Sequence, residues 1–466
     1  MTSNTLWYGD NLSILRSFDA ESVDLIYLDP PYNSKRDYNC TFGSVAQSKA
    51  FTDTWTWGAD DESNLAFLDK HYPSVHLLLQ SLGMLLTKRG LYPYLVAMSV
   101  RLVEMHRVLK NTGSIYLHVD PTASHYLKLV MDQIFGGGNF RNEIIWFYNT
   151  QGKPKMGFAK KHDTLLCYSK STDWQWNKIT IEPNDVARYN KVDDDGRRYQ
   201  IDGKGYKYYL DAGRHCPDVW DIPALTNNAH ERLGYPTQKP LALLERIIKA
   251  SSNEGDVVLD PYMGSGTTIE AAAAHGRKWI GIDVTHHAVA TTVNRLKECG
   301  LDVTKEQIIG VPEDLASARK LKADSPRQFD AWCVLQCDAF PSDEGERIIG
   351  IKSFASIAKG KEHKRRALYS ATLGDPPAMA DIKSTLALMN KKGCEVGFLY
   401  CFEMPEDPAV LKTINNLPAY ADDMREVPQL QLITMRDLLH GCSAPNITSE
   451  YRARRMRDLS RQMELV

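Results

Sequence analysis

The chain has 466 residues, 43% of them hydrophobic and 24% charged, and a formal net charge of −2. This composition is typical of a globular protein of two or three domains, and the near-zero charge predicts no general attraction to a polyanion. We find no apolar run of about 18 residues and no signal peptide, so we expect a cytoplasmic protein without a membrane segment. Its nine cysteines form no CxxC pair or zinc-spaced cluster, which indicates reduced thiols and no metal site.

The first part of the chain alternates predicted strands and helices. A strand at 6–10, a helix at Asn11–Ser17 and a strand at Val23–Leu28 make the strand–helix–strand unit of a parallel sheet. Residues 34–75 show no clear period, so we expect a long functional loop or lid there. Further predicted elements are a helix at 91–110, a strand at 114–120, a helix at 121–135 and strands at 142–148 and 164–168.

Two consecutive prolines follow the buried strand that ends at Leu28. The segment Asp29-Pro30-Pro31-Tyr32 must leave the sheet in a stiff turn, at the strand end where open α/β sheets bind ligands. A carboxylate, the Pro30 carbonyl and an aromatic ring held together suit a planar base with an exocyclic amine. The alternative is a structural turn in which Asp29 is a cap and Tyr32 is packing.

Residues 150–230 interrupt the alternating pattern and are predicted to form an insert. Residues 141–215 carry 14 Lys and Arg against 10 Asp and Glu, interleaved with aromatic residues. This mixture suits a nucleic-acid surface, although a solvated insert with ordinary aromatic residues has the same composition. His118 lies near a strand end, where it could contact a ligand or be a hydrogen-bonded core histidine.

The pattern returns after residue 235 with a glycine loop. A helix at 241–250 and a strand at 256–260 precede the loop at 261–268, which opens a helix at 269–275 and leads to a strand at 278–283. The glycines allow close backbone approach, the helix N-terminus favours an anionic group, and an acid at the next strand end can bind ribose hydroxyls. The loop lacks GxGxxG and Gly-Lys-Ser/Thr, which argues against dinucleotides and nucleoside triphosphates.

Together these motifs resemble the amino-group DNA methyltransferases of the permuted (β) arrangement. Asp29-Pro30-Pro31-Tyr32 matches the DPPY catalytic motif, and residues 260–268 match the cofactor motif, with Tyr262 where the family often has Phe. Residues 236–240 match the HPTQKP segment, with Tyr235 in place of His, and residues 162–170 are similar to the strand after motif VII. The resemblance covers roughly residues 1–300.

The resemblance implies an α/β fold with a Rossmann-like, seven-stranded methyltransferase sheet, circularly permuted, that binds S-adenosyl-L-methionine. The methyltransferase domain would comprise residues 1–149 and 231–310, a target-recognition insert residues 150–230, and a separate α/β domain residues 311–466. Asp10 would contact the adenine of the cofactor, unless it only caps the following helix, and Asp283 would bind the ribose. Lys239, otherwise a surface residue, and the loop at Gly264–Gly266 would bind the methionyl end. The cofactor-binding residues implied are Asp10, Lys239, Asp260, Tyr262, Gly264, Ser265, Gly266, Thr267 and Asp283.

The catalytic residues implied are Asp29, Pro30, Pro31 and Tyr32. The Asp29 carboxylate and the Pro30 carbonyl would accept hydrogen bonds from the amine of a base flipped out of duplex DNA, and Tyr32 would stack on the base. In the family, an aspartate first in the motif is associated mainly with adenine N6, so we favour adenine over cytosine N4. Methylation of cytosine carbon 5 typically uses a Pro-Cys nucleophile, and no cysteine of this chain follows a proline.

Other functions remain open at this point. RNA or protein amide methyltransferases use similar motifs, a second activity could cleave DNA, and a non-catalytic binding module is a further alternative. Residues after about 311 faintly resemble restriction-endonuclease-like domains, with Asp343 and Lys352 as candidate residues but Gly350 where a metal-binding acid belongs. This domain could be an active nuclease, a degenerate nuclease-like module or unrelated. Besides double-stranded DNA, the partners considered are a second copy of the chain and a restriction or defence protein.

Overall fold

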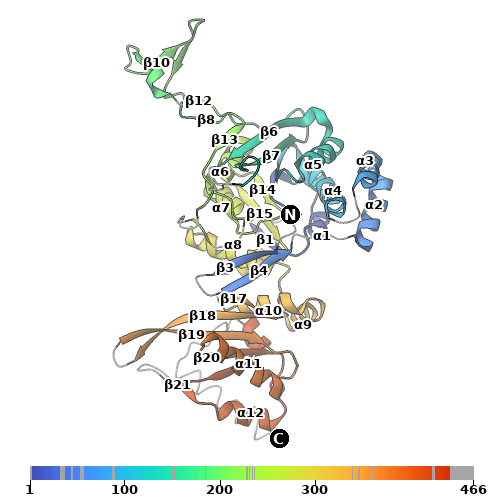
Figure 1. The fold of residues 1–466 in the computed structure, drawn as a ribbon, viewed down its shortest axis with the longest axis vertical. Coiled ribbons are helices and arrows are strands. Elements are labelled where there is room, and N and C mark those ends of the chain that lie inside the picture. The colour runs from blue at the N-terminus through green and yellow to red at the C-terminus, as the bar shows by residue number, and fades with distance from the viewer. Residues whose placement is uncertain are drawn as a thin grey trace.

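The computed structural model shows two α/β sheets, one from each part of the chain (Figure 1). It describes residues 3–31, 37–42, 46–52, 57–86, 90–148, 154–183, 185–226, 229, 231–233, 235, 237–337, 339–344, 347–358, 361–421 and 426–440.

The central sheet has nine strands in the order β13-β6-β7-β5-β2-β14-β15-β1-β16. Neighbouring strands from β5 to β16 are parallel, whereas β7 is antiparallel to both β5 and β6. The predicted number was seven, and the two extra strands are the short edge strands β13 and β16. The strands are β1 (Thr5–Tyr8), β2 (Val23–Leu28), β5 (Leu109–Val119), β6 (Phe140–Phe147), β7 (His162–Ser169), β13 (Val219–Asp221), β14 (Val257–Asp260), β15 (Lys278–Asp283) and β16 (Ile308–Ile309).

Helices cover both faces of this sheet, and each face has its own hydrophobic core. One core joins the sheet to α1 (Asn11–Ser17), α4 (Leu91–Val108) and α5 (Ser124–Met131). The other joins it to α6 (Leu241–Ser251), α7 (Thr267–Ala274) and α8 (His286–Glu298). A sheet buried on both faces explains why the predicted strands read as continuous apolar runs rather than as alternating ones.

The expectation of a long loop at 34–75 is wrong. This region contains the hairpin of β3 (Asp37–Phe42) and β4 (Ala46–Thr52), then α2 (Ala59–His71) and the start of α3 (Pro73–Leu85). The helix α2 could not be predicted from periodicity because it has no apolar stripe: Leu68 is its one buried apolar side chain among the described residues. Its start is fixed instead by Asp61, whose carboxylate accepts the Gly58 N–H at 2.9 Å.

The predicted insert is too wide at both ends, because β7 and β13 fall within 150–230 and pair in the central sheet. Between them, β8 (Thr180–Ile181) and β12 (Arg214–His215) form a narrow stem. The stem carries a small sheet of β9 (Lys191–Val192), β10 (Arg198–Ile201) and β11 (Lys207–Tyr209), which projects from the body (Figure 1). Because Ser169 pairs with Ser114, the chain leaves β7 at the amino-end edge of the parallel strands.

The C-terminal part forms a five-stranded sheet in the order β17-β18-β19-β20-β23 with cores of its own. Its strands are β17 (Phe340–Glu344), β18 (Arg347–Ala358), β19 (Lys361–Ala371), β20 (Val396–Cys401) and β23 (Leu430–Thr434), with a hairpin of β21 (Ala419–Ala421) and β22 (Glu426–Pro428). The helices are α9 (Leu315–Asp324), α10 (Pro326–Leu335), α11 (Met379–Lys392), α12 (Pro408–Asn415) and α13 (Met435–Leu439). β17 lies beside β4 of the first part (Figure 1). Within the described ranges, no helix has the length and apolar character needed to span a bilayer.

Candidate active site at the carboxyl edge of the central sheet

A pocket of about 260 Å³ lies where β2, β14 and β15 end. Residues from both distant motifs line it, which brings the turn after β2 and the glycine loop together as the sequence predicted. The predicted site residues in its wall are Asp10, Asp29, Pro31, Lys239, Asp260, Tyr262, Gly264, Ser265, Thr267 and Asp283. Pro30 is buried next to the pocket, Gly266 belongs to the glycine loop but does not line the pocket, and Tyr32 lies outside the described residues.

The glycine loop takes its shape from packing as well as from ligand access. Gly264 and Gly266 have positive φ angles of +49° and +76°, which disfavour other residues. A Cβ atom on Gly266 would lie 2.5 Å from Oγ1 of Thr292 in α8, so only glycine allows this close approach. Gly264 N–H donates to Asp283 Oδ2 at 3.0 Å and thereby ties the loop to the end of β15.

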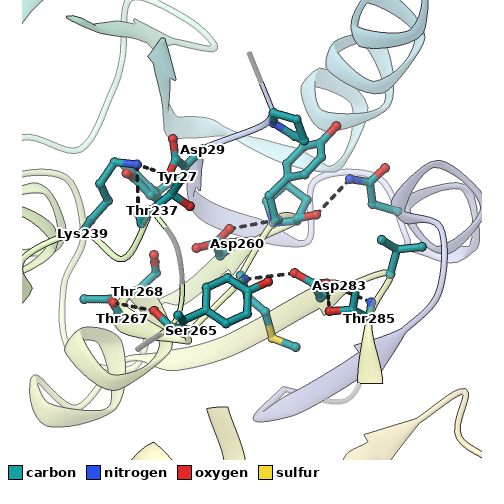
Figure 2. Close-up of a pocket in the computed structure, with 18 of the residues that line it drawn as sticks. Tyr27, Asp29, Thr237, Lys239, Asp260, Ser265, Thr267, Thr268, Asp283 and Thr285 are labelled. Carbon is teal, nitrogen blue, oxygen red and sulfur yellow. Dashed lines mark hydrogen bonds and ion pairs between the residues drawn. The ribbon is translucent and has the colours of Figure 1, made fainter. Parts of the chain in front are cut away.

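A buried carboxylate, Asp260, and a partly buried one, Asp283, lie at the floor of the pocket (Figure 2). Burial raises the pKa of Asp260 to about 7, and the negative charges of Asp29 and Asp283 act in the same direction. Burial also raises the pKa of Asp283, although hydrogen bonds from Thr285 and Gly264 oppose the shift. Asp283 accepts both the N–H and the hydroxyl of Thr285 at 2.9 Å. A carboxylate held by donors in this way is ready to accept hydrogen bonds from a ligand hydroxyl.

Asp10 has two roles at the opposite wall. Its carboxylate caps α1 by accepting the Leu12 N–H at 3.0 Å, which is the alternative weighed from the sequence. It also faces the pocket and forms a 2.6 Å ion pair with Arg101 of α4. Arg101 in turn donates to Asn11, which donates to the Pro261 carbonyl at 2.9 Å. This chain of contacts fixes α1, α4 and the glycine loop relative to one another, and nothing local in the sequence indicated Arg101.

Lys239 pairs with the carboxylate of Asp29 (Figure 2). Its ammonium donates to Asp29 Oδ2 and to the Thr237 carbonyl at 3.3 Å. Both side chains are largely buried, 10% exposed for Lys239 and 14% for Asp29, so the pair is shielded from solvent. The segment 237–240 therefore meets the turn after β2, and Lys239 is not a solvated surface residue.

A polar row continues from Asp29 across neighbouring strand ends. Tyr27, which also lines the pocket, shares a 3.0 Å hydrogen bond with Nδ1 of His118. Nε2 of His118 lies 3.3 Å from Asp163 Oδ2, and Asp163 Oδ1 accepts the Tyr148 hydroxyl at 3.1 Å. His118 is fully buried, so it is the hydrogen-bonded core histidine considered above. Tyr27 was missed in the sequence, although its position two residues before Asp29 on a strand puts both side chains on one face.

The candidate nuclease residues of the C-terminal sheet lie in a different setting. Lys352 of β18 donates to the Cys337 carbonyl at 3.1 Å, which gives it a structural contact, while Asp343 of β17 pairs through its backbone with Ile348. Across the part of the chain that the structure describes, no group of three His, Cys, Asp or Glu side chains is placed to hold a metal ion.

Comparison with known proteins identifies the class of this sheet and pocket. The family model described as DNA methylase matches residues 23–294, more than half of the chain, and the chain belongs to that family. As a member, the protein is an S-adenosylmethionine-dependent DNA methyltransferase.

Two curated relatives and one solved structure are similar to this chain. DNA adenine methyltransferase YhdJ of Escherichia coli (strain K12) is 29% identical over 325 residues, which cover 69% of this chain and 89% of the relative. Type II methyltransferase M.HpaI of Haemophilus parainfluenzae is 29% identical over 309 residues, or 66% of this chain and 78% of the relative. Among solved structures, PvuII DNA methyltransferase (cytosine-N4-specific) matches with a TM-score of 0.38 and 17% identity, covering 66% of this chain and 90% of the other.

Proposed function

We propose that this enzyme transfers the methyl group to N6 of an adenine flipped out of duplex DNA at specific sites. The observation that carries the proposal is the shared pocket, in which Asp29 and Lys239 lie at one end and Asp260, Asp283 and the glycine loop at the other. The aspartate that opens the DPPY motif and the adenine specificity in the name of the Escherichia coli relative support adenine over cytosine.

The pocket residues fit S-adenosylmethionine. Asp283 and Thr285 present acceptors for ribose hydroxyls, Asp10 lies at the wall for the adenine edge, and the N-terminus of α7 at Thr267 suits the methionyl carboxylate. Asp260, Tyr262, Gly264 and Ser265 complete this half of the pocket. When bound, the cofactor supplies a methyl group made electrophilic by its sulfonium.

The turn after β2 is proposed to hold the amine. One oxygen of Asp29 and the Pro30 carbonyl accept its two N–H bonds, which draws the nitrogen toward tetrahedral geometry and stabilises the positive charge that develops on it. Lys239 pairs with Asp29 and orients its carboxylate, and we propose this role for Lys239 in place of contact with the methionyl end. Pro31 stiffens the turn, and Tyr32 stacks on the extruded base, which offsets part of the cost of unstacking it.

We propose the permuted arrangement for this domain. The strand that precedes Asp29 comes early in the sequence, and the strand that precedes the glycine loop comes more than 200 residues later, yet β2 and β14 are neighbours in the sheet. The seven strands from β6 to β1 would be the methyltransferase core, with β13 and β16 as additions.

DNA contact is proposed for residues 154–161, the part of the predicted insert that joins β6 to β7 at the carboxyl edge. Met156 is 91% exposed and Phe158 is fully exposed, and Lys155, Lys160 and Lys161 accompany them. Lysines suit the phosphates, and an exposed apolar side chain suits insertion where a base has left the stack. The projecting small sheet would contact DNA farther from the target base.

For the domain from residue 311 on, we propose a DNA- or partner-binding module of degenerate nuclease-like type within a restriction, defence or epigenetic system. Its separate sheet and cores support an independent unit. The basic segment Arg452–Arg461, expected to be a helix, lies outside the described residues.

The proposed specificity is tested by incubating the purified full-length protein with S-adenosylmethionine and unmethylated bacterial DNA, followed by digestion to nucleosides and mass spectrometry. N6-methyladenine is the expected product, and long-read sequencing of the same DNA gives the recognition sequence. N4-methylcytosine would overturn the base assignment, and methylation of RNA in place of DNA would overturn the substrate class. Incubation with Mg²⁺ and no cofactor shows whether the chain also cleaves DNA.

A further inference from the structure

We infer that Tyr27, His118 and Asp163 form a proton relay beside Asp29, with Tyr27 as a catalytic residue and the other two as positioning residues that act through it. This inference rests on the proposed function, since it assigns a route for the proton that the methylated amine must lose. It adds three residues that neither sequence motif contains.

The row is built by strand register. Tyr27 of β2 is opposite Tyr116 of β5, and His118 is two residues farther along β5 on the same face. His118 is opposite Leu165 of β7, so Asp163 also lies on that face. Three neighbouring strands therefore present Tyr27, His118 and Asp163 side by side at the edge where the pocket opens.

In the proposed relay the hydrogen bonds are all donated in one direction, from Tyr27 to His118 and from His118 to Asp163. Burial works to raise the pKa of Asp163, but the hydrogen bond from His118 and the charge of Lys239 outweigh it and lower the pKa. The relay uses the Nε2–H tautomer of His118, in which Nε2 donates to Asp163 and Nδ1 is an acceptor. In this tautomer the Tyr27 hydroxyl donates to Nδ1, and Tyr27 lines the pocket together with Asp29.

The proton step is balanced without any further reactant. Once the amine nitrogen carries the new methyl group, one of its N–H bonds breaks and the electron pair stays on nitrogen. The Asp29 carboxylate, which accepted that N–H, passes the proton to the Tyr27 oxygen while the original Tyr27 proton moves to Nδ1 of His118. The imidazolium formed faces the Asp163 carboxylate, which is 21% exposed and connects the row to solvent. Burial makes it costly for Tyr27 to ionise, since the pKa of its hydroxyl is raised well above 10, with Asp29, Asp260 and Asp163 adding to the shift. Tyr27 therefore acts by exchanging one proton for another.

The test compares Tyr27→Phe and His118→Gln with the wild-type full-length protein in single-turnover methylation of duplex DNA. We expect a fall in the rate constant of about 10²-fold for Tyr27→Phe, with cofactor and DNA affinities within about twofold by calorimetry. The wild type should show a normal solvent deuterium isotope effect that Tyr27→Phe lacks. Tyr116→Phe is the matched control, because Tyr116 is a buried tyrosine on the same sheet face whose hydroxyl contacts Ser251 at 2.6 Å. It should retain the wild-type rate.

A readout without catalysis separates the relay from the proposed function. In ¹⁵N-histidine NMR of the protein alone, His118 should be the Nε2–H tautomer, and Tyr27→Phe should shift its Nδ1 resonance. A wild-type rate in Tyr27→Phe, or an Nδ1–H tautomer of His118, overturns the relay. A wild-type protein that methylates no DNA overturns the proposed function instead, while the NMR result still decides the donor direction.

Discussion

Both α/β parts of the molecule contain buried carboxylates, but they balance them in different ways. In the C-terminal part, Asp330 of α10 is 3% exposed and accepts hydrogen bonds from Arg347 at 2.6 Å and 3.1 Å in a closed ion pair. In the central sheet, Asp260 and Asp283 are held by backbone N–H groups and hydroxyls, and among the described residues neither forms an ion pair. Asp330 therefore serves the fold, whereas Asp260 and Asp283, which only neutral donors hold, keep their capacity to bind a ligand.

The largest expected effect follows from removing the Asp29 carboxylate, which is proposed to hold the amine of the target base. Asp29→Ala should lower the methylation rate by about 10³-fold or more, because the developing charge on the amine loses its acceptor. Cofactor affinity should change little, since Asp29 lies at the other end of the pocket from Asp283. Tritiated methyl transfer and calorimetry measure the two quantities. Retained activity would remove Asp29 from the catalytic role.

Breaking the closed ion pair should affect stability instead. Arg347→Met leaves the buried Asp330 without its cation, which is expected to cost about 3–5 kcal/mol. Hydrogen exchange should show faster opening of the C-terminal sheet and an unchanged central sheet. Lys391→Met is the control, because Lys391 is 65% exposed in its pair with Glu344 and should cost about 1 kcal/mol or less. Equal losses in the two variants would contradict the difference drawn between closed and exposed pairs.

The raised pKa of Asp260 should make the free energy of unfolding depend on pH. The pKa of Asp260 is about 7 in the folded protein and near 3.8 when unfolded, so the folded state binds an extra proton between these values. This contribution to stability is complete below pH 4 and is lost as pH rises through 7. The stability advantage of Asp260→Asn over the wild type should therefore grow by about 3 kcal/mol between pH 5 and pH 8. Urea unfolding at both pH values measures it, and a constant difference would contradict the raised pKa.

The smallest effect concerns the exposed edge beside the pocket. Phe158→Ala should weaken DNA binding by about tenfold or less, because the lost contact is a single aromatic one. Fluorescence anisotropy with labelled duplex DNA measures the affinity. Val192→Ala, on the projecting small sheet and 59% exposed, is the comparison variant. A larger loss in Val192→Ala would move the main DNA contact from residues 154–161 to that sheet.

Local sequence signals predicted the elements that position the site. The strands β2 and β15 and the helix α1 have the predicted bounds, because apolar runs and caps are encoded by neighbouring residues. The meeting of the two motifs was also predicted, since both follow strands that end at one edge.

What the sequence did not reveal depends on contacts between distant residues. Lys239 and Asp29 are 210 residues apart, and the row from Tyr27 through His118 to Asp163 exists only in the register of three strands. The helix α2 was missed because it packs without an apolar stripe. The edges of the insert were misjudged because β13 is a strand of three residues, too short for periodicity to detect.

The position of β1 has a consequence for how the enzyme is made. This strand pairs with β15 and β16, which end at residues 283 and 309. During synthesis β1 must stay unpaired until those residues have been made. Since exposed strand edges in such intermediates promote aggregation, this order of synthesis favours slow, chaperone-assisted maturation.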